Sequence, residues 1–203
     1  MMEGAREHSS PLFEIPIRCK FECPSSPHAG QTRVEFRLSG LDVVDLRKDW
    51  YIGSMYSAKG SLTLICTDET ELAAELEEDL AGILDRHSIV VSGDPFWMPP
   101  AWSFQYGVSL YVEIVEAWVE SGATGSTEFK IPIEATVIFR AALEDDTDWT
   151  TLWQEEFRGT DERSIWYSSS PHHAESLKRA YCEAIRSFEA AIGSAEFLGA
   201  IRR

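Results

Sequence analysis

The chain has no hydrophobic run long enough to cross a membrane. Its 203 residues contain no stretch of about 18 consecutive apolar residues, which a bilayer-spanning helix requires. Residues 1–10 also lack the apolar centre of a secretory signal peptide, and neither Cys19 nor Cys23 lies in the small-residue context of a lipid-modified cysteine. We therefore expect a soluble protein with no transmembrane segment. We expect it in the cytoplasm, or in the cell envelope if the true start lies upstream.

Cysteine and histidine are scarce. Four cysteines are too few and too scattered for a disulfide framework, so we expect Cys66 and Cys182 to be buried thiols. The pair Cys19 and Cys23 lacks the two further soft ligands of a structural metal site. Adjacent histidines at 172–173 point about 100° apart on a helix and cannot chelate one ion, so we expect surface polar residues there. The sequence predicts no metal and no cofactor.

Basic residues are nearly absent from the middle of the chain. The formal net charge is −16, and the segment 61–170 holds 22 acidic against five basic residues. A negative field of this size repels phosphate backbones, which argues against nucleic-acid binding. It favours solubility or a basic protein partner.

Recognisable catalytic motifs are also missing. The chain has no Gly-x-Ser-x-Gly elbow, no phosphate loop and no dinucleotide fingerprint. The acidic turn at 145–148 lacks the glycine and the terminal glutamate of a calcium loop, and Glu155 and Glu156 point to opposite faces of a strand. We therefore predict no enzymatic activity. The alternative is an unrecognised hydrolase that uses carboxylates around Asp145 or Glu155.

What the chain does contain is strong strand periodicity. Apolar residues alternate from Val108 to Ile114 and from Phe129 to Phe139, which predicts two strands joined as a hairpin through the loop 121–126. A third strand is predicted from Trp149 to Phe157, ended by Gly159. The three strands form a meander. Shorter strands are predicted within 12–21, 33–38, 61–66 and 89–91, with a loop containing Gly53 between the second and third of these.

Two segments have helical periodicity. Asp68 and Glu71 form a capping box before leucines at helical spacing that continue to Arg86. A second helix is predicted with Ser170 as its cap and Pro171 at its first position, and Gly193 ends it. The predicted fold is α/β in the α+β sense: one mixed or antiparallel sheet with a three-stranded meander and two helices packed on one face. We assign residues 1–10 to a flexible arm and 11–203 to a single domain.

Two loops are the predicted binding surface. Aromatic residues alternate with prolines between the short strand at 89–91 and the hairpin, and glycines at the hairpin tip permit positive φ angles. The predicted contact residues are Phe96, Trp97, Met98, Trp102, Gly122 and Gly125.

The order of these elements resembles small bacterial outer-membrane lipoproteins of the YajG type and related envelope accessory lipoproteins. The matching features are the helix 68–86, the strand 89–91, the hairpin 106–143, the pattern Trp153-x-x-x-Phe157-x-Gly159 and the closing helix near Ser170. The resemblance covers about residues 60–193 and implies a binding or scaffolding domain with no catalytic residues. The chain departs from that family because it shows neither a signal peptide nor a lipid-accepting cysteine.

The preferred hypothesis is therefore a non-enzymatic binding or scaffolding domain of the bacterial cell envelope. An alternative is an acidic cytosolic inhibitor or immunity-type protein that binds a basic protein through the segment 61–170, and such binding would weaken with salt. Neither the oligomeric state nor the identity of the partner follows from the sequence.

Overall fold

A computed structural model of the chain describes residues 13–14, 36–47, 51–56, 62–66, 69–92, 107–122, 130–166 and 169–202. The predicted arm, residues 1–10, lies outside this part. The described elements, in chain order, are β1 (Phe13–Glu14), β2 (Phe36–Leu38), β3 (Gly40–Asp45), β4 (Tyr51–Tyr56), β5 (Leu62–Cys66), α1 (Glu69–Arg86), β6 (Ile89–Val91), β7 (Val108–Ser121), β8 (Ile131–Asp145), β9 (Thr151–Ile165), α2 (Ser170–Ile192) and α3 (Ala195–Ile201).

Three long strands form the centre of the sheet. β7, β8 and β9 pair antiparallel in sequence order, which confirms the predicted meander. In β8 every second residue from Ile131 to Leu143 is buried, because that face of the sheet lies against the helices. The predicted α+β fold with a mixed sheet is therefore confirmed.

The strands paired with β7 on the side away from β8 differ from the prediction. β3 and β4 lie end to end along β7, and both are parallel to it: Asp45 is opposite Ile114 and Gly53 is opposite Val119. The predicted loop around Gly53 is therefore wrong. Gly53 lies inside β4, close to β7. A Cβ at this position would collide with the Val119 carbonyl oxygen, so only glycine permits this close pairing.

The sheet continues beyond β4 and a small second sheet lies apart from it. β5 pairs antiparallel with β4, and β1 adds a short parallel strand at the edge. β2 and β6 form a separate two-stranded parallel sheet, with Phe36 opposite Ile89. The predicted strands near 33–38, 61–66 and 89–91 are present. Of the predicted strand within 12–21, only Phe13–Glu14 lies within the described residues.

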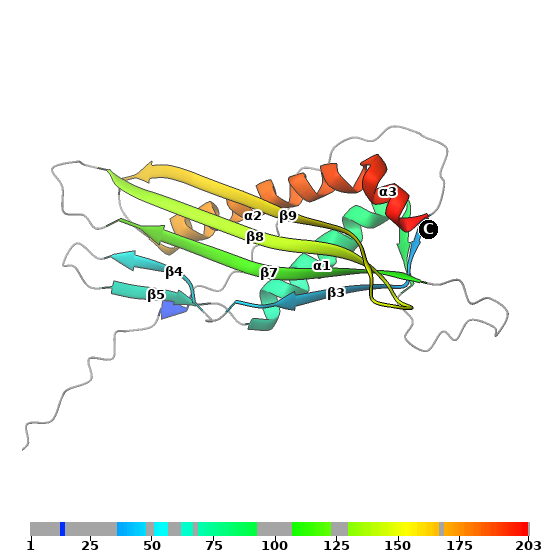
Figure 1. The fold of residues 1–203 in the computed structure, drawn as a ribbon. Helices are drawn as coiled ribbons and strands as arrows, with labels where there is room; N and C mark the ends of the chain where they lie inside the picture. Colours follow the sequence, from blue (N-terminus) through cyan, green and yellow to red (C-terminus); the bar gives the residue numbers. More distant parts are fainter. Residues whose placement is uncertain are drawn as a thin grey trace, which may run out of the picture.

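Both long helices cover the same face of the sheet, as predicted. Figure 1 shows α1 behind β3 and β7, and α2 behind β8 and β9. The apolar stripe of α2 is buried, with Leu177, Tyr181 and Phe188 at most 2% exposed. Across the helix pair, the Tyr181 hydroxyl donates to Asp79 Oδ2 at 2.7 Å. None of the described helices combines length with enough apolar character to cross a bilayer.

The short helix α3 was not predicted. It begins after Ser194, whose hydroxyl accepts a hydrogen bond from the Phe197 amide at 3.2 Å. Phe197 is fully buried and meets the Trp153 ring edge-on at a centroid distance of 4.9 Å. α3 thus covers the end of the core near the start of β9, where Figure 1 shows it beside the C-terminus.

Gly159 does not end β9, contrary to the sequence prediction. β9 continues to Ile165, and Gly159 is buried beneath α2. A Cβ at this position would collide with the Ala180 carbonyl oxygen and lie 2.6 Å from the Ala184 amide nitrogen. Glycine is therefore present because the backbone of α2 approaches the strand directly, not because the strand stops.

Candidate functional site

Most residues of the predicted contact loops lie outside the described residues. Phe96, Trp97, Met98, Trp102 and Gly125 belong to this group, so their role stays a prediction.

Gly122 is described, and it has a structural role. Its amide donates to the Pro132 carbonyl oxygen at 3.0 Å, and a Cβ would lie 2.9 Å from Pro132 Cγ. Gly122 therefore closes the base of the β7–β8 hairpin.

Two tryptophans, Trp149 and Trp166, are exposed. Trp149 was predicted on the third strand, but it lies in the β8–β9 turn with a φ of 60° and 64% exposure. Trp166 follows β9, is 69% exposed and has Lys130 Nζ 5.4 Å from its ring centroid. The residue pair next to it, Ile131 and Ile165, joins β8 to β9 at the same end of the sheet. The exposed rings of Trp149 and Trp166 thus lie at opposite ends of the meander.

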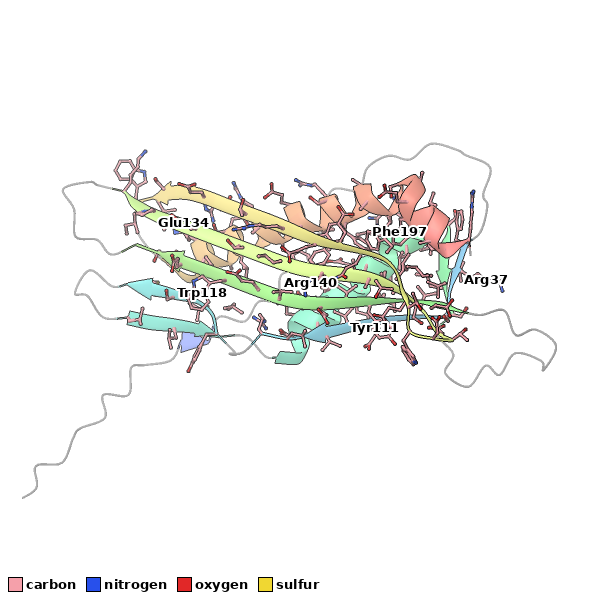
Figure 2. All side chains as sticks on the ribbon, in the orientation of Figure 1. Arg37, Tyr111, Trp118, Glu134, Arg140 and Phe197 are labelled. Atoms are coloured by element: carbon pink, nitrogen blue, oxygen red, sulfur yellow. The ribbon has the colours of Figure 1, made fainter. Side chains whose placement is uncertain are left out.

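The described helices leave the opposite side of the sheet uncovered (Figure 1). We call it the open face: the residues of β3, β7, β8 and β9 that alternate with the buried ones. Figure 2 shows Tyr111, Trp118, Glu134 and Arg140 along it. Its acidic residues are Asp42, Glu113, Glu116, Glu120, Glu134, Glu144, Glu156 and Glu162, and its basic residues are Arg140 and Arg158.

Arg140 neutralises one row of the open face. In that row it lies between Glu113 on β7 and Glu156 on β9 in the strand register. Arg140 Nη1 is 3.5 Å from Glu113 Oε2, and Arg140 Nη2 is 3.3 Å from Glu156 Oε2. One cation on the central strand thus offsets the carboxylates on both neighbours.

A second row has the same geometry without a cation. Glu120 on β7, Glu134 on β8 and Glu162 on β9 are directly opposite one another in register, and all three are exposed. Directly opposed like charges destabilise a sheet, by up to about 1 kcal/mol for each pair. The open face therefore carries an electrostatic cost that a cation at the position of Glu134 would remove.

A groove lies beside β7, next to the ends of β3 and β4. β7 has a bulge at Val115, and among the described strands it has no partner on the β3–β4 side between Ile114 and Val119. The groove has a volume of about 420 Å³. It is lined by Leu46, Arg47, Tyr51, Glu113, Val115, Glu116, Ala117, Trp118 and Arg140.

Arg47 is the buried polar group of the groove. Its side chain is 7% exposed and is held by Asp45: Nε lies 2.9 Å from Oδ1 and Nη2 lies 2.6 Å from Oδ2. Nη1 is buried and has no hydrogen-bond partner in the described structure. Burying a guanidinium donor without an acceptor costs free energy, so this atom favours a ligand that brings an acceptor to the groove wall.

The histidine pair at the start of α2 is not the surface pair that the sequence predicted. His173 is fully buried, and its Nδ1 lies 2.8 Å from the Ser169 carbonyl oxygen. Burial lowers its pKa below 6.5. Nearby, the fully buried Ser176 hydroxyl donates to Asp161, and Arg163 Nη2 donates to the His172 carbonyl oxygen at 2.6 Å. These polar groups lie under the helix and hold it to β9.

The acidic turn at 145–148 is a self-capped turn. Asp145 Oδ1 accepts from the Thr147 amide at 2.8 Å, and Asp148 Oδ1 accepts from the Thr150 amide at 3.0 Å. The hydrogen bonds from Thr150 lower the pKa of Asp148. Within the described ranges no cluster of three or more metal-ligating side chains occurs.

The prediction that Cys182 is a buried free thiol is wrong. Cys182 lies on α2, is 7% exposed and is disulfide-bonded. The sequence treated it as a core thiol because no close cysteine neighbour exists in the chain. Contacts between distant segments create such pairs, and spacing alone does not show them.

Comparisons with known proteins establish the fold and not a family. No family model matches the chain, and no curated protein matches it. Among solved structures, XCC0632 from Xanthomonas campestris, a DUF330 protein, matches 81% of this chain and 87% of its own with a TM-score of 0.50 at 13% identity. This likeness shows that the two proteins share a fold.

Two further solved structures are similar to the chain at lower TM-scores. A protein from Helicobacter pylori, described as a homolog of the neuraminyllactose-binding hemagglutinin, has a TM-score of 0.45 at 9% identity, covering 86% of this chain and 96% of its own. A minor lipoprotein from Acinetobacter baumannii has a TM-score of 0.41 at 12% identity, covering 76% and 91%. With TM-scores below 0.5, these two carry no argument. The specific YajG resemblance stays a prediction.

Sequence reasoning missed the groove, although one signal was present. The alternation of β7 breaks at Val115 and Glu116, which are both exposed, and such a break is typical of a bulge. Arg47, by contrast, gives no sequence signal, because its value as a binding residue depends on burial.

Proposed function

We propose that this chain is a non-enzymatic binding or scaffolding domain of the bacterial cell envelope, and that it binds a basic protein through the open face. The observation that carries the proposal is the uncompensated row of Glu120, Glu134 and Glu162. A lysine or arginine of a partner, placed over this row, would do what Arg140 does for the other row. Partner binding would then remove a repulsion that the free protein bears.

The disulfide supports the envelope over the cytosol. Disulfides persist in oxidising compartments such as the bacterial periplasm, whereas cytosolic thiols are kept reduced. Cys182 is disulfide-bonded in a buried position on α2. The fold shared with a DUF330 protein is compatible with this location, and the looser likenesses to lipoproteins add no weight.

The non-enzymatic role is supported by how the buried polar groups are used. His173 and Ser176 are fully buried. His173 contacts the Ser169 carbonyl oxygen at the start of α2, and Ser176 donates to Asp161 on β9 and so ties α2 to the sheet. In the acidic turn Asp145 and Asp148 accept from backbone amides of the turn, and Asp146 accepts from the Ser39 hydroxyl. A carboxylate-dependent hydrolase around Asp145 or Glu155 is therefore the weaker hypothesis.

The acidic inhibitor or immunity-type protein stays a second candidate, because the open face would serve it equally well. The two hypotheses share the binding surface and differ in the compartment. Mapping free and oxidised cysteines by alkylation and mass spectrometry in protein isolated without reductant separates them. An oxidised Cys182 favours the envelope, and a free thiol favours the cytosolic inhibitor.

The variant Glu134→Arg tests the binding role. It recreates the Arg140 arrangement in the acidic row, so we expect the melting temperature to rise by about 1–3 °C, equivalent to about 0.5–1 kcal/mol. The same change should weaken binding of a cationic probe, acetylated and amidated octalysine. The matched control is Glu77→Arg on the exposed side of α1, which makes the same charge change away from the open face.

The expected result is that Glu134→Arg weakens octalysine binding at least about fivefold more than Glu77→Arg does, in fluorescence anisotropy at constant ionic strength. Equal losses for both variants would show that only total charge matters and would contradict a binding role for the open face.

A further inference from the structure

We propose that the groove beside the β7 bulge binds an extended peptide segment of the partner, with an apolar side chain in the groove and a main-chain carbonyl oxygen accepting from Arg47 Nη1. This inference rests on the proposed binding function and adds the chemical class of the ligand. Three observations carry it: the unpaired guanidinium nitrogen of Arg47, the apolar wall and the acidic rim.

The unpaired nitrogen defines the ligand atom. Asp45 already neutralises Arg47 through a bidentate pair, so the remaining donor requires an acceptor but not a second negative charge. In the groove lining Arg140 already pairs with Glu113, and the remaining carboxylate, Glu116, disfavours a second carboxylate there. A neutral carbonyl oxygen satisfies the donor without this repulsion, and a peptide backbone supplies one at every residue.

The lining of the groove favours an apolar side chain of the bound peptide. Leu46 and Val115 are 52% and 38% exposed, and Trp118 and Tyr51 complete the lining. Covering these apolar groups is favourable at about 25 cal/mol for each Å² removed from water. The groove volume of about 420 Å³ lies within the range of ligand pockets and accommodates one or two aliphatic side chains.

The acidic residues beside the groove favour basic residues next to the apolar anchor of the bound peptide. Glu120, the first member of the acidic row, lies two residues beyond Trp118 on β7, a distance of about 7 Å along a strand. A lysine about two residues from the apolar anchor would therefore reach that row.

The test uses a defined peptide, acetyl-Ala-Leu-Val-Lys-Ala-Lys-amide, titrated into the isotope-labelled full chain and followed by NMR. The decisive variant is Arg47→Lys, which keeps the positive charge beside Asp45 but removes the second terminal nitrogen. The matched control is Arg179→Lys on α2, where Arg179 makes an exposed ion pair with Glu175. We expect a loss of about tenfold for Arg47→Lys and no change for Arg179→Lys.

A second variant keeps the test independent of Asp45. Leu46→Ser changes a half-exposed side chain of the groove wall and should weaken binding about threefold or more without loss of folding. The peptide with alanine in place of leucine should bind the wild-type chain correspondingly less well. Unchanged affinity for both Arg47→Lys and Leu46→Ser would overturn the proposal.

Two other outcomes separate this inference from the proposed function. If Glu134→Arg weakens peptide binding but Arg47→Lys does not, the open face binds the partner and the groove does not. If the peptide fails to bind while palmitate binds in an Arg47-dependent manner, the groove accepts a fatty acyl chain and the peptide assignment is wrong.

Discussion

Replacing Gly159 by alanine tests how the sheet and α2 fit together. The added Cβ would collide with the Ala180 carbonyl oxygen and lie 2.6 Å from the Ala184 amide nitrogen and 2.9 Å from the Ala180 carbonyl carbon. All three atoms belong to the helix backbone, so no side-chain rotation relieves the overlap. α2 must move away from β9 by roughly 1 Å, and gaps of this size forfeit a quarter to a half of the local dispersion energy.

The expected cost lies at the upper end of the range for overpacked cores, about 3 kcal/mol. For a chain of this length, about 3 kcal/mol corresponds to a fall in melting temperature of about 6–12 °C. Differential scanning calorimetry measures the change. The matched control is Gly199→Ala in α3, because nothing lies within 4 Å of a Cβ at that position.

The control should move in the opposite direction. Gly199 is exposed within a helix, so alanine there should stabilise the protein by about 0.5–1 kcal/mol through backbone entropy. Equal melting temperatures for the wild type and Gly159→Ala would show that α2 does not lie directly on β9 and would refute the packing argument.

Three further predictions concern buried groups. Burial lowers the pKa of His173, so the neutral imidazole stabilises the fold above pH 6.5 and this stabilisation is lost as the pH falls below 6.5. The free energy of unfolding should fall by up to about 1.4 kcal/mol per pH unit in that range. Denaturant unfolding of His173→Asn between pH 7 and 5 should lack this pH-dependent loss of stability. Tyr181→Phe removes the donor to Asp79, whose pKa burial already raises, and urea titration should show a loss of about 1–2 kcal/mol; an unchanged midpoint would contradict the link between the helices. Cys182→Ala should destabilise the oxidised chain by about 2–4 kcal/mol and leave the reduced chain nearly unaffected, so equal losses in both states would argue against the disulfide.

The central fold was predictable because its signal is local. Alternation from Val108 to Ile114 and along β8 fixes which face is buried, and the helical stripe of α2 does the same for its partner layer. β3 and β4 were missed because they are short strands whose pairing depends on β7, far along the chain. Gly53 and Gly159 read as breakers, although each marks a close approach between backbones.

The candidate site was less predictable. Charge counting identified the acidic segment, but only the strand register shows that Glu120, Glu134 and Glu162 form one row. The value of Arg47 depends on a nitrogen that is buried and unpaired, which no sequence pattern records. The contact loops were predicted from their aromatic, proline and glycine residues, and most of these residues lie outside the described part of the chain.

The most direct test of the open face as a binding surface is site-specific photo-crosslinking. A photoreactive residue at Thr136, next to the acidic row on β8, is compared with one at Glu77 on α1, using proteins extracted from a bacterial cell envelope. We expect a discrete crosslinked species from the photoreactive residue at Thr136, which disappears in the Glu134→Arg background and at high salt. We expect no crosslinked species from the photoreactive residue at Glu77. Crosslinks of equal yield from both positions, or crosslinks from Thr136 that persist in Glu134→Arg, would contradict a binding role for the open face.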